Sequence, residues 1–183
     1  AARPVTTAAA ASTTTPATAA TMPTVSAPAL NRTDLPEDAA QCLARGNSCL
    51  QSGRVEEALR AYDRAIELNP DQLESHFNRG NVLLRLQRQS EALAAFERAI
   101  AISPELAMAH YNRATLLSAA GRVDEARRGY QRTLELDPNF MQARFNLGTL
   151  LLAQGDLPQA LACMDAVIAH APKVPQAHLT RGA

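Results

Sequence analysis

The sequence predicts an all-α protein in which antiparallel pairs of helices stack into a solenoid. Three observations predict this fold: a period of 34 residues, a proline that closes each period, and small residues that recur beside large ones within it. A period of this length suits one helical hairpin, and a hairpin buries both faces only when others stack on it. The registers are Pro70, Pro104, Pro138 and Pro172; Ala58, Ala92, Ala126 and Ala160; Tyr62, Phe96, Tyr130 and Met164; and Gly46, Gly80, Ala114, Gly148 and Gly182.

The physics of one unit, residues 73–106, explains these landmarks. His76, Gly80 and Leu83 fall at positions i, i+4 and i+7, which is one stripe of a first helix. Gly80 has no side chain, so we expect it to let the second helix approach closely, with Phe96 on the buried stripe of that helix. The proline at the end of the unit cannot extend the helix and resets the chain for the next unit.

The period assigns residues 38–183 to one helical domain of four repeats and a partial fifth, at 39–72, 73–106, 107–140, 141–174 and 175–183. We expect first helices near 39–52, 73–86, 107–120 and 141–154. We expect second helices near 56–69, 90–102, 124–136 and 158–170. Glycine suits the turn within a repeat and occurs there as Gly53, Gly121 and Gly155. Of the eight glycines, only Gly129 falls outside the two repeated glycine positions.

Residues 1–37 differ in composition, because alanine, threonine, serine and proline dominate them. Too few large apolar groups are present to offset the entropy of ordering, so we expect a disordered tail or linker. The chain begins at Ala1 rather than methionine and stops inside the partial repeat, which suggests a piece of a longer protein. An unfinished repeat exposes apolar surface, through which the chain could self-associate.

Charge and cysteine content restrict the partners and the compartment. Eighteen basic residues balance eighteen acidic ones, so no overall charge favours nucleic acid or an anionic membrane. No apolar stretch approaches the roughly 18 residues that a membrane-spanning helix requires. Cys42, Cys49 and Cys163 fit neither a disulfide framework nor a zinc spacing, so we interpret them as buried thiols. That interpretation favours a reducing compartment such as the cytoplasm, although the sequence leaves the compartment open.

The sequence indicates no catalytic residue, cofactor or metal, and we expect no enzyme activity from this chain. It contains neither a Gly-rich phosphate loop nor a G-x-S-x-G turn. His76, His110 and His178 recur at one register, which raises the question of a metal site. Neighbouring helices pack about 8–10 Å apart, whereas zinc needs ligand atoms at about 2 Å. We therefore expect packed histidines.

Arginine recurs on the apolar stripe of the first helix, as Arg45, Arg79, Arg113 and Arg181. In one interpretation the stems cover apolar surface while the guanidinium groups reach solvent or an acid on the adjacent helix. In the other, the arginines form a basic ladder that favours acidic ligands. We favour the first.

A 34-residue helix–turn–helix repeat with these landmarks resembles the tetratricopeptide-repeat (TPR) family. The resemblance implies a right-handed superhelix whose first helices line a concave face. It also implies a scaffold that binds another protein or an extended or helical peptide.

Two polar registers follow this concave face. One position carries asparagine after an aromatic residue, and a second polar position lies three residues further on. An asparagine amide can pair with the N–H and C=O of an extended peptide, and the aromatic rings would supply apolar anchors. Alternatively, the asparagines fill gaps between adjacent first helices and the aromatic rings are half core. The candidate peptide-binding residues are Asn47, Phe77, Asn78, Asn81, Tyr111, Asn112, Thr115, Phe145, Asn146 and Thr149.

The asparagine register also resembles the repeats of protein O-GlcNAc transferases and of bacterial multi-repeat TPR proteins. In those transferases, asparagines at the matching position hold a peptide backbone. The resemblance implies the same role for Asn78, Asn112 and Asn146. A second function therefore stays open, in which this chain is the substrate-recognition arm of a larger glycosyltransferase.

Chaperone-adaptor TPR proteins, by contrast, hold a peptide carboxylate with a clamp of cations and asparagines. Asn47 and Asn78 match that clamp, but Leu43, Met108 and Asn112 stand where its cations should be. We therefore reject the clamp.

Overall fold

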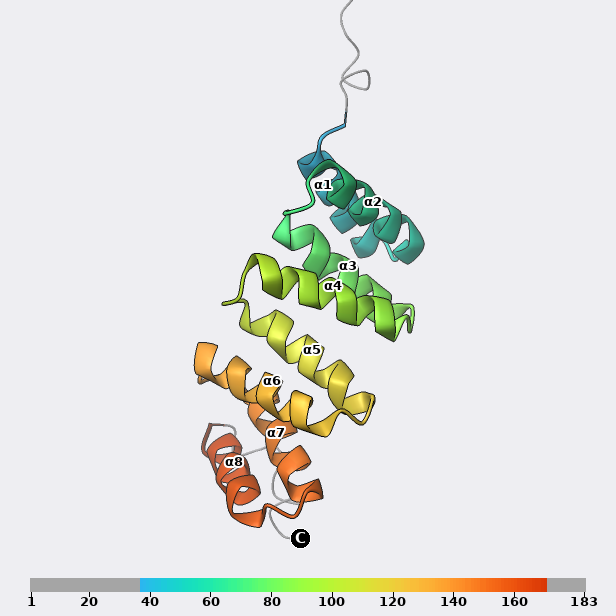
Figure 1. Cartoon of the computed structure of the whole chain (residues 1–183). Helices are drawn as coiled ribbons and strands as arrows, with labels where there is room; N and C mark the ends of the chain where they lie inside the picture. Colours follow the sequence, from blue (N-terminus) through green and yellow to red (C-terminus); the bar gives the residue numbers. More distant parts are fainter. Residues whose placement is uncertain (1–36, 171–183) are drawn as a thin grey trace, which may run out of the picture. The chain divides into compact units, whose positions relative to one another are not determined.

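In the computed structural model, residues 37–170 are described, and they form eight α-helices without a strand (Figure 1). Each predicted helix is present, and its bounds differ from the prediction by at most one residue. The predicted tail and the partial fifth repeat lie outside the described residues. The first helices are α1 (Ala39–Gln51), α3 (Leu73–Arg85), α5 (Ala107–Ala119) and α7 (Met141–Ala153). The second helices are α2 (Val55–Leu68), α4 (Gln89–Ile102), α6 (Val123–Leu136) and α8 (Leu157–His170).

The helices pack mainly on their neighbours in sequence. Each repeat is a hairpin, and α2, α4 and α6 each contact the first helix of the next repeat. The α1 helix also contacts α3, so that first helices lie beside one another. In Figure 1 the four hairpins follow one another in chain order, as the prediction of a TPR-type solenoid requires. None of the helices between residues 37 and 170 combines the length and the apolar character needed to cross a membrane.

A large side chain from each second helix fills the core of its own repeat. These residues are almost completely buried: Tyr62, Phe96, Tyr130 and Met164. The small residue opposite makes this burial feasible. A Cβ atom built on Gly80 would lie 2.7 Å from Cε1 of Phe96, closer than real side chains approach. The predicted role of Gly80 is therefore confirmed.

The third repeat obtains the same close approach with its small residues exchanged. Its first helix carries Ala114 where the other repeats have glycine, and its second helix carries Gly129 where the second repeat has Ala95. A Cβ on Gly129 would lie 2.7 Å from the Cβ of Ala114. The one glycine outside the repeated positions thus compensates for the alanine that faces it.

The turn between the two helices of a repeat needs a left-handed residue. Gly53, Gly121 and Gly155 adopt φ of 74°, 73° and 82°, as their predicted place in the turn requires. In the second repeat Gln87 occupies the same register with φ of 58°. A side chain with a Cβ is disfavoured in this conformation, so Gln87 is a strained position.

Replacing Gln87 with glycine should raise the free energy of unfolding by about 0.5–1 kcal/mol, because the relief of left-handed strain exceeds the added entropy of the unfolded chain. Chemical denaturation monitored by circular dichroism measures the change. The reverse substitution Gly121→Gln is the matched control. A Cβ on Gly121 has no neighbour within 4 Å, so only the backbone conformation is tested, and stability should fall. A destabilised Q87G variant would contradict the assignment of strain.

The cysteines of the described region are unpaired. Cys42 and Cys49 are buried, as predicted, whereas Cys163 is only half-buried. Burial raises the pKa of the Cys42 thiol and that of the Cys163 thiol, which keeps both protonated near neutral pH. These two residues are therefore poor nucleophiles.

Candidate functional site

The asparagines of the first helices connect neighbouring repeats. Nδ2 of Asn78 donates to Oδ1 of Asn47 at 3.1 Å, and Nδ2 of Asn112 donates to Oδ1 of Asn81 at 3.0 Å. These bonds join α3 to α1 and α5 to α3. The interpretation in which the asparagines fill gaps between adjacent first helices therefore accounts for one of the two N–H groups of Asn78 and of Asn112.

The bond between α7 and α5 uses different groups. Nδ2 of Asn146 donates to the Tyr111 hydroxyl at 3.3 Å, which joins α7 to α5. Thr115 and Thr149 occupy the second polar register here, and each hydroxyl donates to the carbonyl one turn earlier on its own helix. These threonines therefore bond within their own helices and leave the inter-repeat bond to Asn146 and Tyr111.

Tyrosines of the second helices donate hydrogen bonds to this row of polar side chains on the first helices, which we call the polar row. The Tyr62 hydroxyl donates to Oδ1 of Asn47 at 2.8 Å, and the Tyr130 hydroxyl donates to Oγ1 of Thr115 at 3.3 Å. Burial raises the pKa of Tyr62, so its hydroxyl remains protonated and able to donate. The polar row is therefore held both between repeats and within them.

Most of the hydrogen-bonding capacity of Asn78, Asn112 and Asn146 remains available. Within residues 37–170, Oδ1 of Asn78, Asn112 and Asn146 receives no hydrogen bond, and each Nδ2 retains a second N–H. All three side chains are half-buried, so these free groups still reach the surface. A partly satisfied amide whose orientation is fixed by its neighbour can pair with a peptide group at low entropic cost.

The three predicted aromatic residues occupy equivalent places and are half-buried. The Phe77 ring lies 5.9 Å from the Phe96 ring, and the Tyr111 ring lies 4.8 Å from that of Phe140. Phe145 packs against the cluster of Met164 and Val167 in α8. Each ring thus contributes one part of its surface to the core and leaves the other part exposed.

The arginine register forms ion pairs between repeats. Nε of Arg79 lies 2.6 Å from Oδ1 of Asp63 on α2, and Nε of Arg113 lies 3.2 Å from Oε1 of Glu97 on α4. At the next junction Leu147 and Gln131 replace the arginine and its acid, and Leu147 is buried. These contacts agree with the favoured interpretation for Arg79 and Arg113. Arg45 pairs with Glu37 instead, and Arg181 lies outside the described residues.

The histidine register anchors the loops between repeats. Nε2 of His76 lies 2.8 Å from the carbonyl oxygen of Pro70, and Nε2 of His110 lies 2.9 Å from that of Pro104. His178 lies outside the described residues. Residues 37–170 contain no group of three or more His, Cys, Asp or Glu side chains placed to hold a metal ion. His76 and His110 therefore have a structural explanation.

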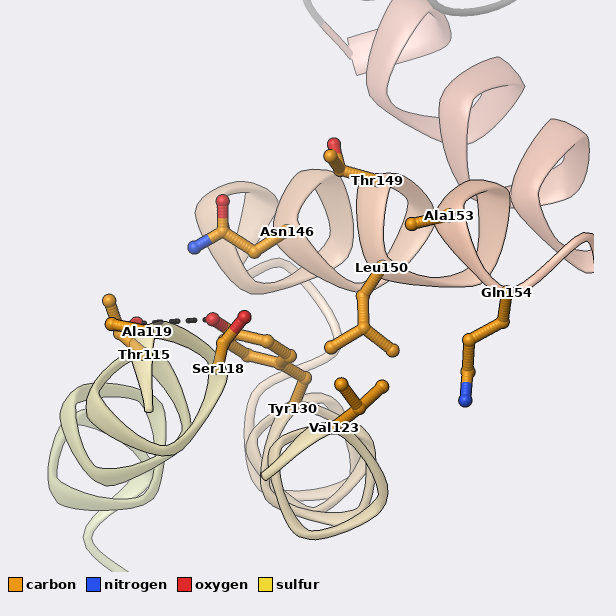
Figure 2. Close-up of a pocket in the computed structure, with 10 residues that line it drawn as sticks. All are labelled: Thr115, Ser118, Ala119, Val123, Tyr130, Asn146, Thr149, Leu150, Ala153 and Gln154. Carbon is orange, nitrogen blue, oxygen red and sulfur yellow. Dashed lines mark hydrogen bonds between the residues drawn. The ribbon is translucent and has the colours of Figure 1, made fainter. Parts of the chain in front are cut away.

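A pocket of about 510 Å³ opens where α5, α6 and α7 meet (Figure 2). Three of the predicted residues line it: Thr115, Asn146 and Thr149. The other predicted residues do not line this pocket. Sequence reasoning missed the remaining lining residues, which are Ser118, Ala119, Val123, Tyr130, Leu150, Ala153 and Gln154. One feature of the sequence could have indicated the pocket: Ser118 occupies a register that carries leucine in the other three repeats.

The helices of residues 37–170 and their pairing define the class of the protein, an all-α repeat protein built from stacked hairpins. The family model for the tetratricopeptide repeat matches residues 43–107 and 111–175. The chain therefore belongs to the tetratricopeptide-repeat family. It is a protein-interaction repeat, and a fold made only of such repeats is typical of non-catalytic modules. No curated protein sequence matches the chain significantly.

Solved structures with the same fold include proteins whose descriptions name a bound peptide or a peptide-binding site. YrrB, described as a TPR protein with an unusual peptide-binding site, is 30% identical, with a TM-score of 0.74 over 79% of this chain and 75% of YrrB. The first TPR domain of Spaghetti (RPAP3), bound to the HSP90 peptide SRMEEVD, is 25% identical, with a TM-score of 0.62 over 64% of this chain and 94% of that one. A mutant O-GlcNAc transferase of Thermobaculum terrenum is 24% identical, with a TM-score of 0.64, and the match covers 72% of this chain but only 26% of the transferase.

Proposed function

We propose that this protein binds an extended peptide along the row formed by α1, α3, α5 and α7, and that Asn78, Asn112 and Asn146 hold the peptide backbone. The observation that carries the proposal is the set of oriented, partly satisfied amides that recurs in three successive repeats, the second to the fourth. A single amide gives little affinity, whereas a row of three gives affinity and a fixed direction.

The spacing of the row suits an extended chain. Adjacent packed helices lie about 8–10 Å apart, and an extended peptide advances about 3.3 Å per residue. Successive amides would therefore meet about every third peptide residue. Contacts of this kind recognise the backbone of the peptide. The exposed parts of Phe77, Tyr111 and Phe145 would add apolar contacts between them.

The neighbours support a peptide ligand, whereas the residues of this chain argue against an acidic one. YrrB and Spaghetti are both described with peptide sites, and the Spaghetti peptide ends in acidic residues. This chain has Leu43, Met108 and Asn112 where the chaperone-adaptor clamp has cations. A carboxylate there would lose hydration without gaining a charged partner. We therefore favour a neutral peptide segment.

The triple substitution of Asn78, Asn112 and Asn146 by alanine tests the proposal. Peptides are first selected on the whole chain from a phage-displayed library of random ten-residue sequences, and their affinities are measured by titration calorimetry. Each lost amide should cost about 1 kcal/mol, so the triple variant should bind roughly 100-fold more weakly. Asn139→Ala, in the exposed loop before α7, is the matched control and should bind normally. Undiminished binding by a folded triple variant would exclude the asparagine row.

The second candidate function is a substrate-recognition arm of a glycosyltransferase. The likeness to the O-GlcNAc transferase favours it, since the chain matches about a quarter of that enzyme. The coding sequence that follows Ala183 decides between the two. A sugar-nucleotide-binding domain would support the arm, whereas a stop codon after one capping helix would exclude it.

Self-association through residues 175–183 also remains a prediction, because those residues lie outside the described range. Light scattering over a range of protein concentrations tests it. A mass that stays monomeric at all concentrations would contradict it.

A further inference from the structure

The pocket beside α5 exists because two side chains are small. The register of Ser118 carries leucine in the other three repeats, and that of Ala119 carries larger polar residues in the first two. The equivalents are Leu50, Leu84 and Leu152 in the first case, and Gln51 and Arg85 in the second. All three leucines pack against the core from a half-buried position. Ser118 and Ala119 leave that volume empty in the third repeat.

The lining of this pocket is uncharged throughout. None of its ten residues carries a charge. Figure 2 shows Val123 and Leu150 pointing toward each other on one side, with Thr115, Ser118 and Tyr130 gathered on the other. The Tyr130 hydroxyl already donates to Thr115, whose own hydroxyl donates to its helix backbone. The hydroxyl side therefore has few donors left for an anion.

The pocket also adjoins the asparagine row. Asn146 lines it, and the same side chain is tied to Tyr111 of the preceding repeat. A peptide held by Asn146 would thus carry a neighbouring side chain over the pocket. The volume of about 510 Å³ lies within the range of roughly 300–1,000 Å³ typical of ligand pockets, and is ample for one side chain.

We propose that this pocket is a specificity subsite that takes one uncharged apolar side chain, of the leucine, methionine or phenylalanine class, from the bound peptide. The proposal rests on the proposed function, because Asn146 places the backbone. An apolar side chain gains free energy by leaving water here. A carboxylate or an ammonium group would lose its hydration, since no lining residue offers an opposite charge. The backbone row gives affinity, and this pocket gives the sequence preference.

The test fills the pocket with the residue that the other repeats already carry. Random ten-residue peptides displayed on phage are selected on the whole wild-type chain and on Ser118→Leu. Wild-type protein should enrich peptides with an apolar residue at one fixed position, and changing that residue to alanine should weaken binding about tenfold. With Ser118→Leu the same change should alter affinity less than about twofold. Ala94→Leu, which adds the same bulk on the exposed face of α4, is the matched control and should behave as wild type.

The outcomes separate this inference from the proposed function. Suppose that peptides are enriched and that their binding depends on Asn78, Asn112 and Asn146, but that the apolar preference survives Ser118→Leu. The subsite proposal is then wrong, and the proposed peptide groove along the first helices is retained. A charged residue at the fixed position leads to the same conclusion. If no peptide is enriched, or binding is independent of the asparagines, the groove is wrong and the subsite is wrong with it. Circular dichroism confirms that each variant is folded.

Discussion

Replacing Phe96 with alanine should lower the free energy of unfolding by about 3–5 kcal/mol. The ring is completely buried and fills the space over Gly80, where even one added carbon would overlap it. It also packs on Phe77 at 5.9 Å, so its loss removes contacts from both helices of the repeat. Glycine at position 80 cannot fill the space, and the cavity would persist.

Denaturant titration of the whole chain measures this loss. Phe77→Ala is the informative control, because it removes the other ring of the same pair from a half-buried position. It should cost clearly less than Phe96→Ala. Equal losses for the two variants would contradict the unequal burial of the two rings. Because a repeat contacts only its neighbours, hydrogen exchange should become faster in α3 and α4 before it does in α7.

Replacing Gly129 with alanine should destabilise the protein by about 1–2 kcal/mol, although alanine is the better helix former by about 1 kcal/mol. The added Cβ would meet the Cβ of Ala114 at 2.7 Å and its Cα at 3.4 Å. Neither atom belongs to a flexible side chain, so the two helices would have to move apart.

The same substitution should reverse its effect when Ala114 is glycine. The double variant places glycine on the first helix and alanine on the second, as Gly80 and Ala95 already do in the second repeat. In that background Gly129→Ala should be neutral or stabilise by up to about 1 kcal/mol. Thermal unfolding of the four proteins of this double-mutant cycle gives the coupling. Simple additivity would show that the two positions do not share one contact.

The fold could be predicted closely because the period constrains every helix at once. Proline at the end of each unit and glycine in three of the four turns predicted the helix bounds to within one residue. The structural roles of Arg79 and His76 could also be predicted from the sequence, because a polar side chain on an apolar stripe has few partners within reach. Gly129 was recognised only as an exception, because its reason lies in Ala114, which is distant in sequence and adjacent in space.

The candidate site was less predictable. The sequence placed Asn78, Asn112 and Asn146 on one face, but the choice of partner across each junction depends on distances between helices, which no pattern contains. Asn146 illustrates this, because it donates to a tyrosine hydroxyl where the other two donate to asparagine. The pocket was missed because it arises from bulk that Ser118 and Ala119 do not have, and a missing side chain leaves no motif.

The change from ion pairs to an apolar contact along the arginine register has a consequence for how the molecule responds to its solvent. Added salt screens partly exposed charges but strengthens apolar association. High ionic strength should therefore weaken the ion pairs of Arg79 and Arg113 at their junctions, while the apolar contact at Leu147 is not weakened. Bending of the repeat array would then concentrate near its amino-terminal half, and the third and fourth repeats would move as one rigid segment.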